Sequence, residues 1–218
     1  MGKKIVIDAC VAIDLNVHKV SFLDDFLNVL GEDTIHISSI NYQEIFNGDI
    51  RRKLQRSPKV SIHENDQSAF EQFSDELEPL KINMGKKDRH VLFLAKTIDA
   101  DYVVSSDLNV VDKTEKYQRY RNFEHLRPLT TVSLLAYLYK QGNIEYDVFF
   151  EKSLYLFKNK EIDNVLNDLS RQNLNTNRQD QIAIINDCKK NFKYRFDLYR
   201  EPLNKELSRI WSTVRVQT

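Results

Sequence analysis

The sequence predicts a three-layer α/β/α domain with a central parallel sheet, followed by an all-helical extension. Short apolar segments rich in β-branched residues, at Lys3–Ile7, Thr34–Ile37 and Tyr102–Ser106, alternate with stretches of helical periodicity. Such alternation is typical of buried parallel strands covered by helices on both faces. Beyond Gly142 the apolar spacing is helical throughout. We therefore expect a catalytic-sized domain at residues 1–140 and a helical extension at residues 141–218.

The other elements of the first domain follow from periodicity and from capping signals. Gly31 is a helix C-cap signal, and Asn41 has the capping-box spacing to Glu44 that opens a helix. In chain order, the remaining expected elements are a helix from Val11 to Gly31, a helix from Asn41, a helix from Gln67 to Leu80, a helix from Asp88, a strand from Leu126 to Leu129 and a helix from Thr131 to Tyr139.

Composition narrows the classes of function. The chain has 218 residues, with 32 Lys and Arg against 32 Asp and Glu, and 41% hydrophobic residues, which is ordinary globular usage. Cys10 and Cys188 lie far apart, and the five histidines show no ligand spacing, so we expect neither a zinc site nor a disulfide framework. The apolar triplet before Asp8 is too short for a signal peptide or a membrane span. We expect a cytoplasmic protein without membrane contact.

Two basic segments leave open a role in binding nucleic acid. Bases outnumber acids in residues 188–215, which suits phosphate contact or a solvated helix face. Residues 113–127 mix basic and aromatic side chains, which would grip a single strand or form an ordinary amphipathic segment. The apolar stripes of residues 141–218 need burial, so we expect the extension to pack on the first domain and to support dimerisation or substrate docking.

Four carboxylates are expected at one edge of the sheet. Asp8 and Asp107 follow apolar strands, and Glu44 and Asp88 lie in the first turns of helices that return from the same edge. Each acid alone has a structural explanation, as a turn, cap or helix-start residue. Together they would repel one another, because their sequence neighbours supply no one-to-one set of cationic partners, and a divalent cation resolves that repulsion. Mg²⁺ or Mn²⁺ prefers oxygen ligands and supports phosphodiester hydrolysis.

These residues resemble the PIN domain. The segment from Ile7 to Val11, the helical Glu44, the Asp88 that opens an apolar helix and the segment from Val103 to Leu108 occur in the order of that family, over about residues 3–140. The resemblance implies an endonuclease that cleaves RNA with Mg²⁺ or Mn²⁺ held by the four carboxylates. It also implies that Ser106 is the hydroxyl residue accompanying the acids.

Many bacterial PIN proteins are toxins held by a small antitoxin protein, so the resemblance also implies an antitoxin as a partner. Toxin, defence and RNA-processing roles stay open. Two features depart from the family: Cys10 stands where Asn or Ser is more usual, and the helical tail is longer than in compact toxins.

Three alternatives compete with the nuclease. A haloacid-dehalogenase-type phosphatase requires a second Asp where the chain has Cys10, and a receiver domain requires an acid at residues 50–55, where there is none. The remaining rival is a catalytically inactive PIN-like scaffold that binds RNA or a protein. The presence of all four acids argues against it.

Overall fold

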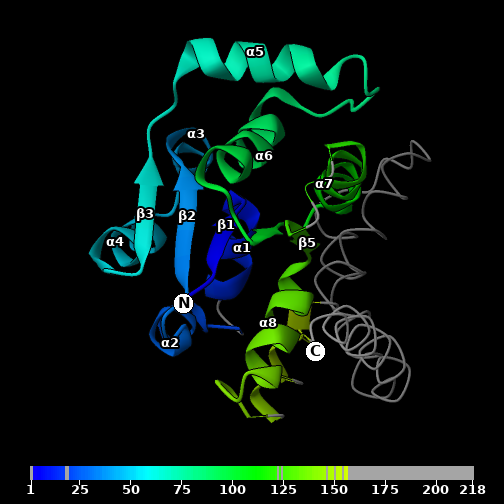
Figure 1. The fold of residues 1–218 in the computed structure, drawn as a ribbon. Helices are drawn as coiled ribbons and strands as arrows, with labels where there is room; N and C mark the ends of the chain where they lie inside the picture. Colours follow the sequence, from blue (N-terminus) through cyan, green and yellow to red (C-terminus); the bar gives the residue numbers. More distant parts are fainter. Residues whose placement is uncertain are drawn as a thin grey trace, which may run out of the picture.

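Five parallel strands form one sheet in the computed structural model, which describes residues 2–17, 20–121, 123, 125–145, 147–149, 151–153 and 155–156. The strand order is β3-β2-β1-β4-β5, with β3 at the left of Figure 1. The bounds are β1 (Lys4–Ile7), β2 (Thr34–Ser38), β3 (Val60–His63), β4 (Tyr102–Val104) and β5 (Arg127–Leu129). Residues 157–218, most of the expected extension, lie outside the described residues.

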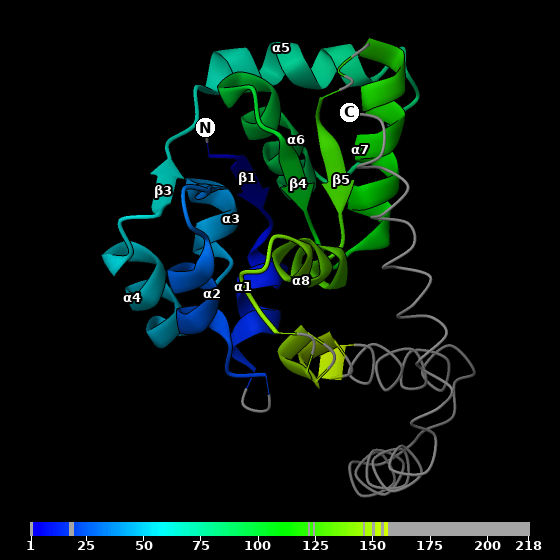
Figure 2. The ribbon, with the colours of Figure 1, turned by 60° about the horizontal axis from the view of Figure 1, so that its bottom comes forward.

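Helices cover both faces of this sheet, as Figure 2 shows. One face packs against α1 (Ala9–Asn16), α2 (Leu23–Val29), α4 (Gly48–Arg56) and α8 (Thr131–Lys140), and the other against α5 (Gln67–Leu77), α6 (Lys86–Ile98) and α7 (Leu108–Arg121). The short helix α3 (Ser39–Gln43) follows β2 directly. The predicted three-layer α/β/α architecture is confirmed. No helix within the described ranges has both the length and the apolar character needed to cross a bilayer.

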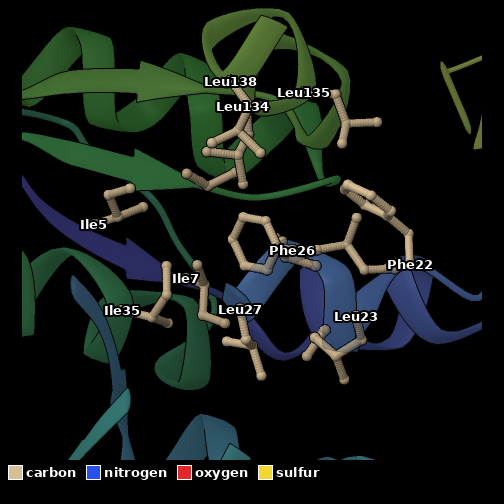
Figure 3. Packing of buried hydrophobic residues seen from close by; sticks show 14 of the residues in the cluster. Ile5, Ile7, Phe22, Leu23, Phe26, Leu27, Ile35, Leu134, Leu135 and Leu138 are labelled. Carbon is tan, nitrogen blue, oxygen red and sulfur yellow. The ribbon is translucent and has the colours of Figure 1, made fainter. Parts of the chain in front are cut away.

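Successive side chains of a strand point to opposite faces of the sheet, so each strand contributes to two hydrophobic cores. Ile5 and Ile7 of β1 join the core on the α1 side, where they lie close to Phe26 (Figure 3), whereas Val6 joins the core under α6. All three β1 side chains are at most 1% exposed. A strand buried on both faces has to be apolar throughout, which is why the central strand was readable from the sequence.

The single helix expected up to Gly31 is wrong, because the structure has two helices, α1 and α2. The break falls where α1 ends at Val17 in an extended conformation and Ser21 adopts a positive φ of 37°. Leu15 and Phe22 are both buried on the same side, so the apolar spacing continued across the turn and mimicked one helix. Gly31, with a φ of 60°, ends the segment as expected.

Two elements around residues 48–63 were not expected. The outer strand β3 has three half-buried residues and one exposed residue, Ser61, so it lacks the apolar run of the central strands. Helix α4 buries only Ile50 and Leu54 among polar residues. The expected helix to Leu80 ends instead at Leu77. Glu78 keeps a helical φ of −63° and ψ of −54°, but Pro79 has no N–H to continue the helical hydrogen bonds.

Candidate functional site

Asp8 lies at the carboxyl end of the central strand with its carboxylate free of a capping role. It occupies the N-cap position of α1 but makes no side-chain cap hydrogen bond. Its side chain is nearly buried, and its Oδ2 accepts hydrogen bonds from Ser105 Oγ at 2.8 Å and from Cys10 Sγ at 3.2 Å. Among the described residues no donor reaches Oδ1. One oxygen is therefore held in place while the other has no protein partner there.

Cys10 acts as a fixed thiol donor at this site. Burial and the charge of Asp8 raise the pKa of Cys10 to about 12, so the thiol stays protonated at neutral pH. Its sulfur also accepts a hydrogen bond from the Ser106 N–H at 3.2 Å. The departure from Asn or Ser at this position therefore keeps a hydrogen-bond donor beside Asp8.

Asp107 lies on the same edge, three residues after β4 ends at Val104. Its Oδ1 accepts the N–H of Asn109 at 2.8 Å, and its own N–H donates to Ser105 Oγ at 3.1 Å. Asp107 thus has the capping role foreseen as the structural explanation for it. Ser105 links Asp107 to Asp8 through one hydroxyl.

Asp88 is the acid whose pKa the other three carboxylates influence. It lies in the first turn of α6, as expected, and is half-buried. Burial raises its pKa most, and the charges of Asp8, Asp107 and Glu44 raise it further, against an opposing backbone hydrogen bond at Gly85. All three other carboxylates therefore act on Asp88 with like charge.

Glu44 is not in the first turn of a helix, contrary to expectation, but is the C-cap residue of α3. The cap of α3 is Ser38, whose Oγ accepts the Asn41 N–H at 3.1 Å. The helix starts three residues earlier than expected. Ser38 and Asn41 are both favoured cap residues, so the sequence alone does not show which of them is the N-cap. Asn41 still contacts Glu44, since its Nδ2 donates to Glu44 Oε2 at 3.3 Å.

Lys87, the residue before Asp88 in the sequence, places its cation on a different acid, Glu44. Its Nζ lies 2.9 Å from Glu44 Oε1, and its backbone carbonyl accepts Asn41 Nδ2 at 3.3 Å. These contacts tie α3 to the start of α6 and bring Glu44 beside Asp88. One of the four carboxylates is thereby neutralised by the protein itself.

The donor set suits a hard divalent cation in its chemistry, since it consists of carboxylate oxygens under mutual repulsion. As they stand, however, no three His, Cys, Asp or Glu side chains in the described ranges are grouped closely enough to hold one ion. The Lys87 ion pair on Glu44 is one physical reason, because it directs an oxygen of Glu44 to an ammonium group.

The two serines after β4 have different partners. Ser106 Oγ donates to Asp14 and lies 2.6 Å from Thr131 Oγ1, whereas Ser105 contacts Asp8. Asp14 is half-buried. Ser105 is therefore the hydroxyl residue next to the carboxylates. Strand β4 ends at Val104, so the alternation of side-chain directions along the strand does not show which of the two following serines faces the acids.

The basic and aromatic stretch after residue 113 is mainly the amphipathic helix α7. Tyr117 is only 2% exposed and packs in the core under α6, so it has no free face for a base. Arg119 pairs with Glu115 at 2.6 Å. The interpretation as an ordinary amphipathic segment fits these side chains. The basic segment at residues 188–215 lies outside the described residues.

Comparison with known proteins gives little beyond the fold. No family model matches the chain, and no curated protein matches it. Among solved structures, a chain of the crystal structure of VapBC2 from Rickettsia felis bound to a DNA fragment from their promoter is 15% identical, with a TM-score of 0.41. The match covers 58% of this chain and 98% of that chain. A likeness this distant carries no argument about the site, which rests on its own geometry.

Proposed function

We propose that the chain is a metal-dependent endonuclease that hydrolyses phosphodiester bonds of RNA. Asp8, Glu44, Asp88 and Asp107 would hold Mg²⁺ or Mn²⁺. When bound, such a cation activates a water molecule and stabilises the leaving oxygen in phosphodiester cleavage. The choice of RNA over DNA rests on the resemblance to PIN domains.

The observation that carries the proposal is the convergence of Asp8, Glu44 and Asp107 on Asp88 at the carboxyl edge of the sheet, close enough for their charges to raise the pKa of Asp88. Besides burial, like charges from all three other acids raise it, although these acids come from three separate segments of the chain. A fold that needed these residues only as caps has no reason to bring their charges together. A bound divalent cation would offset the repulsion and keep all four ionised.

The surrounding residues have defined parts in this proposal. Ser105 and Cys10 donate to the same oxygen of Asp8, which orients the carboxylate and leaves Oδ1 toward a ligand. Ser105 also fixes the backbone of Asp107. Hydrogen-bonded support of this kind commonly positions carboxylate ligands.

Cleavage of an end-labelled RNA by the purified full chain tests the proposal. We expect cleavage with Mg²⁺ or Mn²⁺, none with EDTA, and a loss of about 100-fold or more in Asp8→Asn. Asp112→Asn, an exposed acid on α7, is the matched control and should cleave like the wild type. If wild type and Asp8→Asn cleave equally, the activity is a contaminant and the proposal fails.

A second candidate is the inactive scaffold, which the Lys87 ion pair on Glu44 favours. Metal-dependent melting separates the two functions. For a nuclease, Mn²⁺ at ten times its Kd should raise the free energy of unfolding of the wild type by about 1.4 kcal/mol. The free energy of unfolding of Asp107→Asn should not change. A scaffold with Lys87 in place of a metal should show no shift in either protein.

The biological setting is part of the same proposal. For a toxin held by an antitoxin, expression of the wild type arrests growth and expression of Asp107→Asn does not. Harmless expression of active enzyme favours an RNA-processing or defence role instead. Deletion of residues 145–218, with assembly state and RNA affinity as readouts, tests the proposed dimerisation and docking role of the extension.

A further inference from the structure

Phe46 is the most exposed large hydrophobic side chain in the part of the chain that the structure describes. It is 93% exposed, compared with 58% for Tyr120, 47% for Leu108 and 39% for Ile13. The loop that carries it is firmly held, because Ile45 is fully buried and Asn47 Oδ1 caps α4 through the N–H groups of Asp49 and Ile50. A fixed loop thus presents an aromatic ring to solvent.

The loop that carries this ring follows Glu44 directly, and cations contact Glu44 and Tyr42 in this corner of the fold. Phe46 is two residues from Glu44, which Lys87 contacts at 2.9 Å. Lys86 is exposed and forms no ion pair with any described residue. The guanidinium of Arg51 lies over the Tyr42 ring, 5.3 Å from its centroid, at the same corner between α3 and α4. Positive charge next to an exposed ring is the arrangement that binds a nucleic-acid strand.

We propose that Phe46 stacks on an unpaired base of a single-stranded nucleic acid, with the neighbouring phosphates held by Lys86 and Lys87. The inference rests on the proposed function and narrows its substrate to single-stranded segments, because bases stacked in a duplex offer no free face. Stacking would place the strand next to Glu44 and Asp88.

A base is a better occupant for this ring than a protein surface. The chain neighbours Gln43, Asn47, Gly48 and Asp49 are exposed and polar, so the ring stands alone on its loop. The centre of a protein interface is a continuous apolar patch with charged residues depleted. A single ring on a polar loop lacks that patch but is sufficient for one base.

Tyr120 supplies a matched control. It is also an exposed aromatic residue beside a lysine, since Lys116 Nζ lies 5.7 Å from its ring centroid. It is thirteen residues after Asp107 along α7, a helical distance of about 20 Å from the carboxylate edge. Its replacement controls for the loss of an exposed ring in general.

Binding of a short, fluorescein-labelled single-stranded RNA to the full chain in EDTA tests the inference without turnover. We expect Phe46→Ala and Phe46→Leu each to weaken binding about fivefold or more, and Phe46→Trp to retain it. Tyr120→Ala should bind like the wild type. An RNA of the same length with abasic positions should bind wild type and Phe46→Ala equally, because no base is present to stack.

Four outcomes would overturn the inference: no binding by the wild type, unchanged affinity in Phe46→Ala, full rescue by Phe46→Leu, or an equal loss in Tyr120→Ala. Sedimentation of the same variants separates a further case. If Phe46→Ala alters only self-association, a second copy of the chain covers the ring, and the inference is wrong.

The cleavage assay distinguishes a failure of the stacking proposal from a failure of the proposed nuclease function. Cleavage that needs Asp8 together with unchanged RNA affinity in Phe46→Ala refutes only the stacking. RNA binding that needs Phe46 without any cleavage refutes only the nuclease.

Discussion

The two edges of the sheet carry the same type of residue in opposite electrostatic situations. At the amino edge, Asp33 and Asp101 precede β2 and β4, whereas at the carboxyl edge Asp8 and Asp107 follow β1 and β4. All four are strand-end aspartates, and by sequence position alone each has the same turn or cap explanation.

At the amino edge the acids are fully partnered. Asp33 accepts the Lys3 N–H at 2.7 Å and the Tyr137 hydroxyl at 2.9 Å, one on each oxygen. Asp101 accepts Lys3 Nζ at 2.8 Å and the Lys4 N–H at 2.9 Å. The bond to Asp101 raises the pKa of Lys3, and burial and Asp33 raise that of Tyr137, so both donors stay protonated.

At the carboxyl edge the charge is only partly compensated. Lys87 neutralises Glu44, but Asp88 is under the repulsion of its neighbours. The comparison teaches that uncompensated charge, rather than the presence of aspartate, distinguishes a candidate site from a structural one. Variants at the two edges can therefore be set against each other.

The largest expected effect is at the amino edge. Asp33→Ala should lower the free energy of unfolding by about 3 kcal/mol, because it leaves the Tyr137 hydroxyl and the Lys3 N–H without an acceptor. Asp8→Ala in EDTA should cost less than about 1 kcal/mol, since relief of repulsion offsets the lost Ser105 bond. Urea unfolding measures both. If the two variants lose the same free energy of unfolding, the two edges do not differ in charge compensation.

The sequence revealed the residues of both edges but not this difference. Strands β1, β2 and β4 could be predicted because apolar segments marked them, and Asp88 could be placed because it lies in the first turn of α6. Outer strand β3 and polar helix α4 escaped, since their burial depends on packing against neighbours rather than on their own periodicity.

The contacts that define the site join residues far apart in the chain. Glu44 meets Lys87 across 43 positions of sequence, and Ser105 meets Asp8 across 97. No local pattern encodes such pairs, so neither the neutralisation of Glu44 nor the role of Ser105 was predictable. The exposure of Phe46 was not predictable either, because its neighbour Ile45 is also apolar and no local pattern shows which of the two is buried.

The next effect concerns a pair of histidines on the neighbouring strands β2 and β3. His36 Nδ1 lies 2.8 Å from His63 Nε2, and Thr34 Oγ1 lies 2.9 Å from His36 Nε2. Burial, with the charges of His63 and Lys4, lowers the pKa of His36 to about 4, and burial lowers that of His63. Only one proton can occupy the bond between the rings, so a doubly charged pair breaks it.

Acid should therefore weaken the fold through this pair. Below pH 6.5 the unfolded chain binds more protons than the native one, so stability falls as pH decreases toward about 4. We expect a loss of about 1 kcal/mol, since half-exposure screens the full effect. His36→Gln should flatten this window in melting curves, whereas His125→Gln, an exposed control, should not. A slope retained in His36→Gln would contradict the assignment.

A smaller effect, of opposite sign to that at Asp33, is expected at Asp88. Its raised pKa makes stability fall as pH increases from 3.8 through the folded-state pKa, because the native state holds the proton longer. Asp88→Asn in EDTA should remove this slope and raise stability at neutral pH by up to about 1 kcal/mol. Thermal melting across pH measures it, with Asp112→Asn as the control. If Asp88→Asn is less stable than the wild type, repulsion between carboxylates does not destabilise the carboxyl edge.

The smallest effect separates the two candidate functions most sharply. Lys87 is 64% exposed and Glu44 28% exposed, so Lys87→Met in EDTA should cost only about 0.5 kcal/mol. With Mn²⁺ present the sign should reverse, because removing the ammonium frees a Glu44 oxygen, and metal should then stabilise the variant more than the wild type. Lys86→Met, which breaks no ion pair among the described residues, is the matched control. If Lys87→Met gains nothing from Mn²⁺, the ammonium is a permanent replacement for the cation, and the carboxyl edge is compensated in the same way as the amino edge.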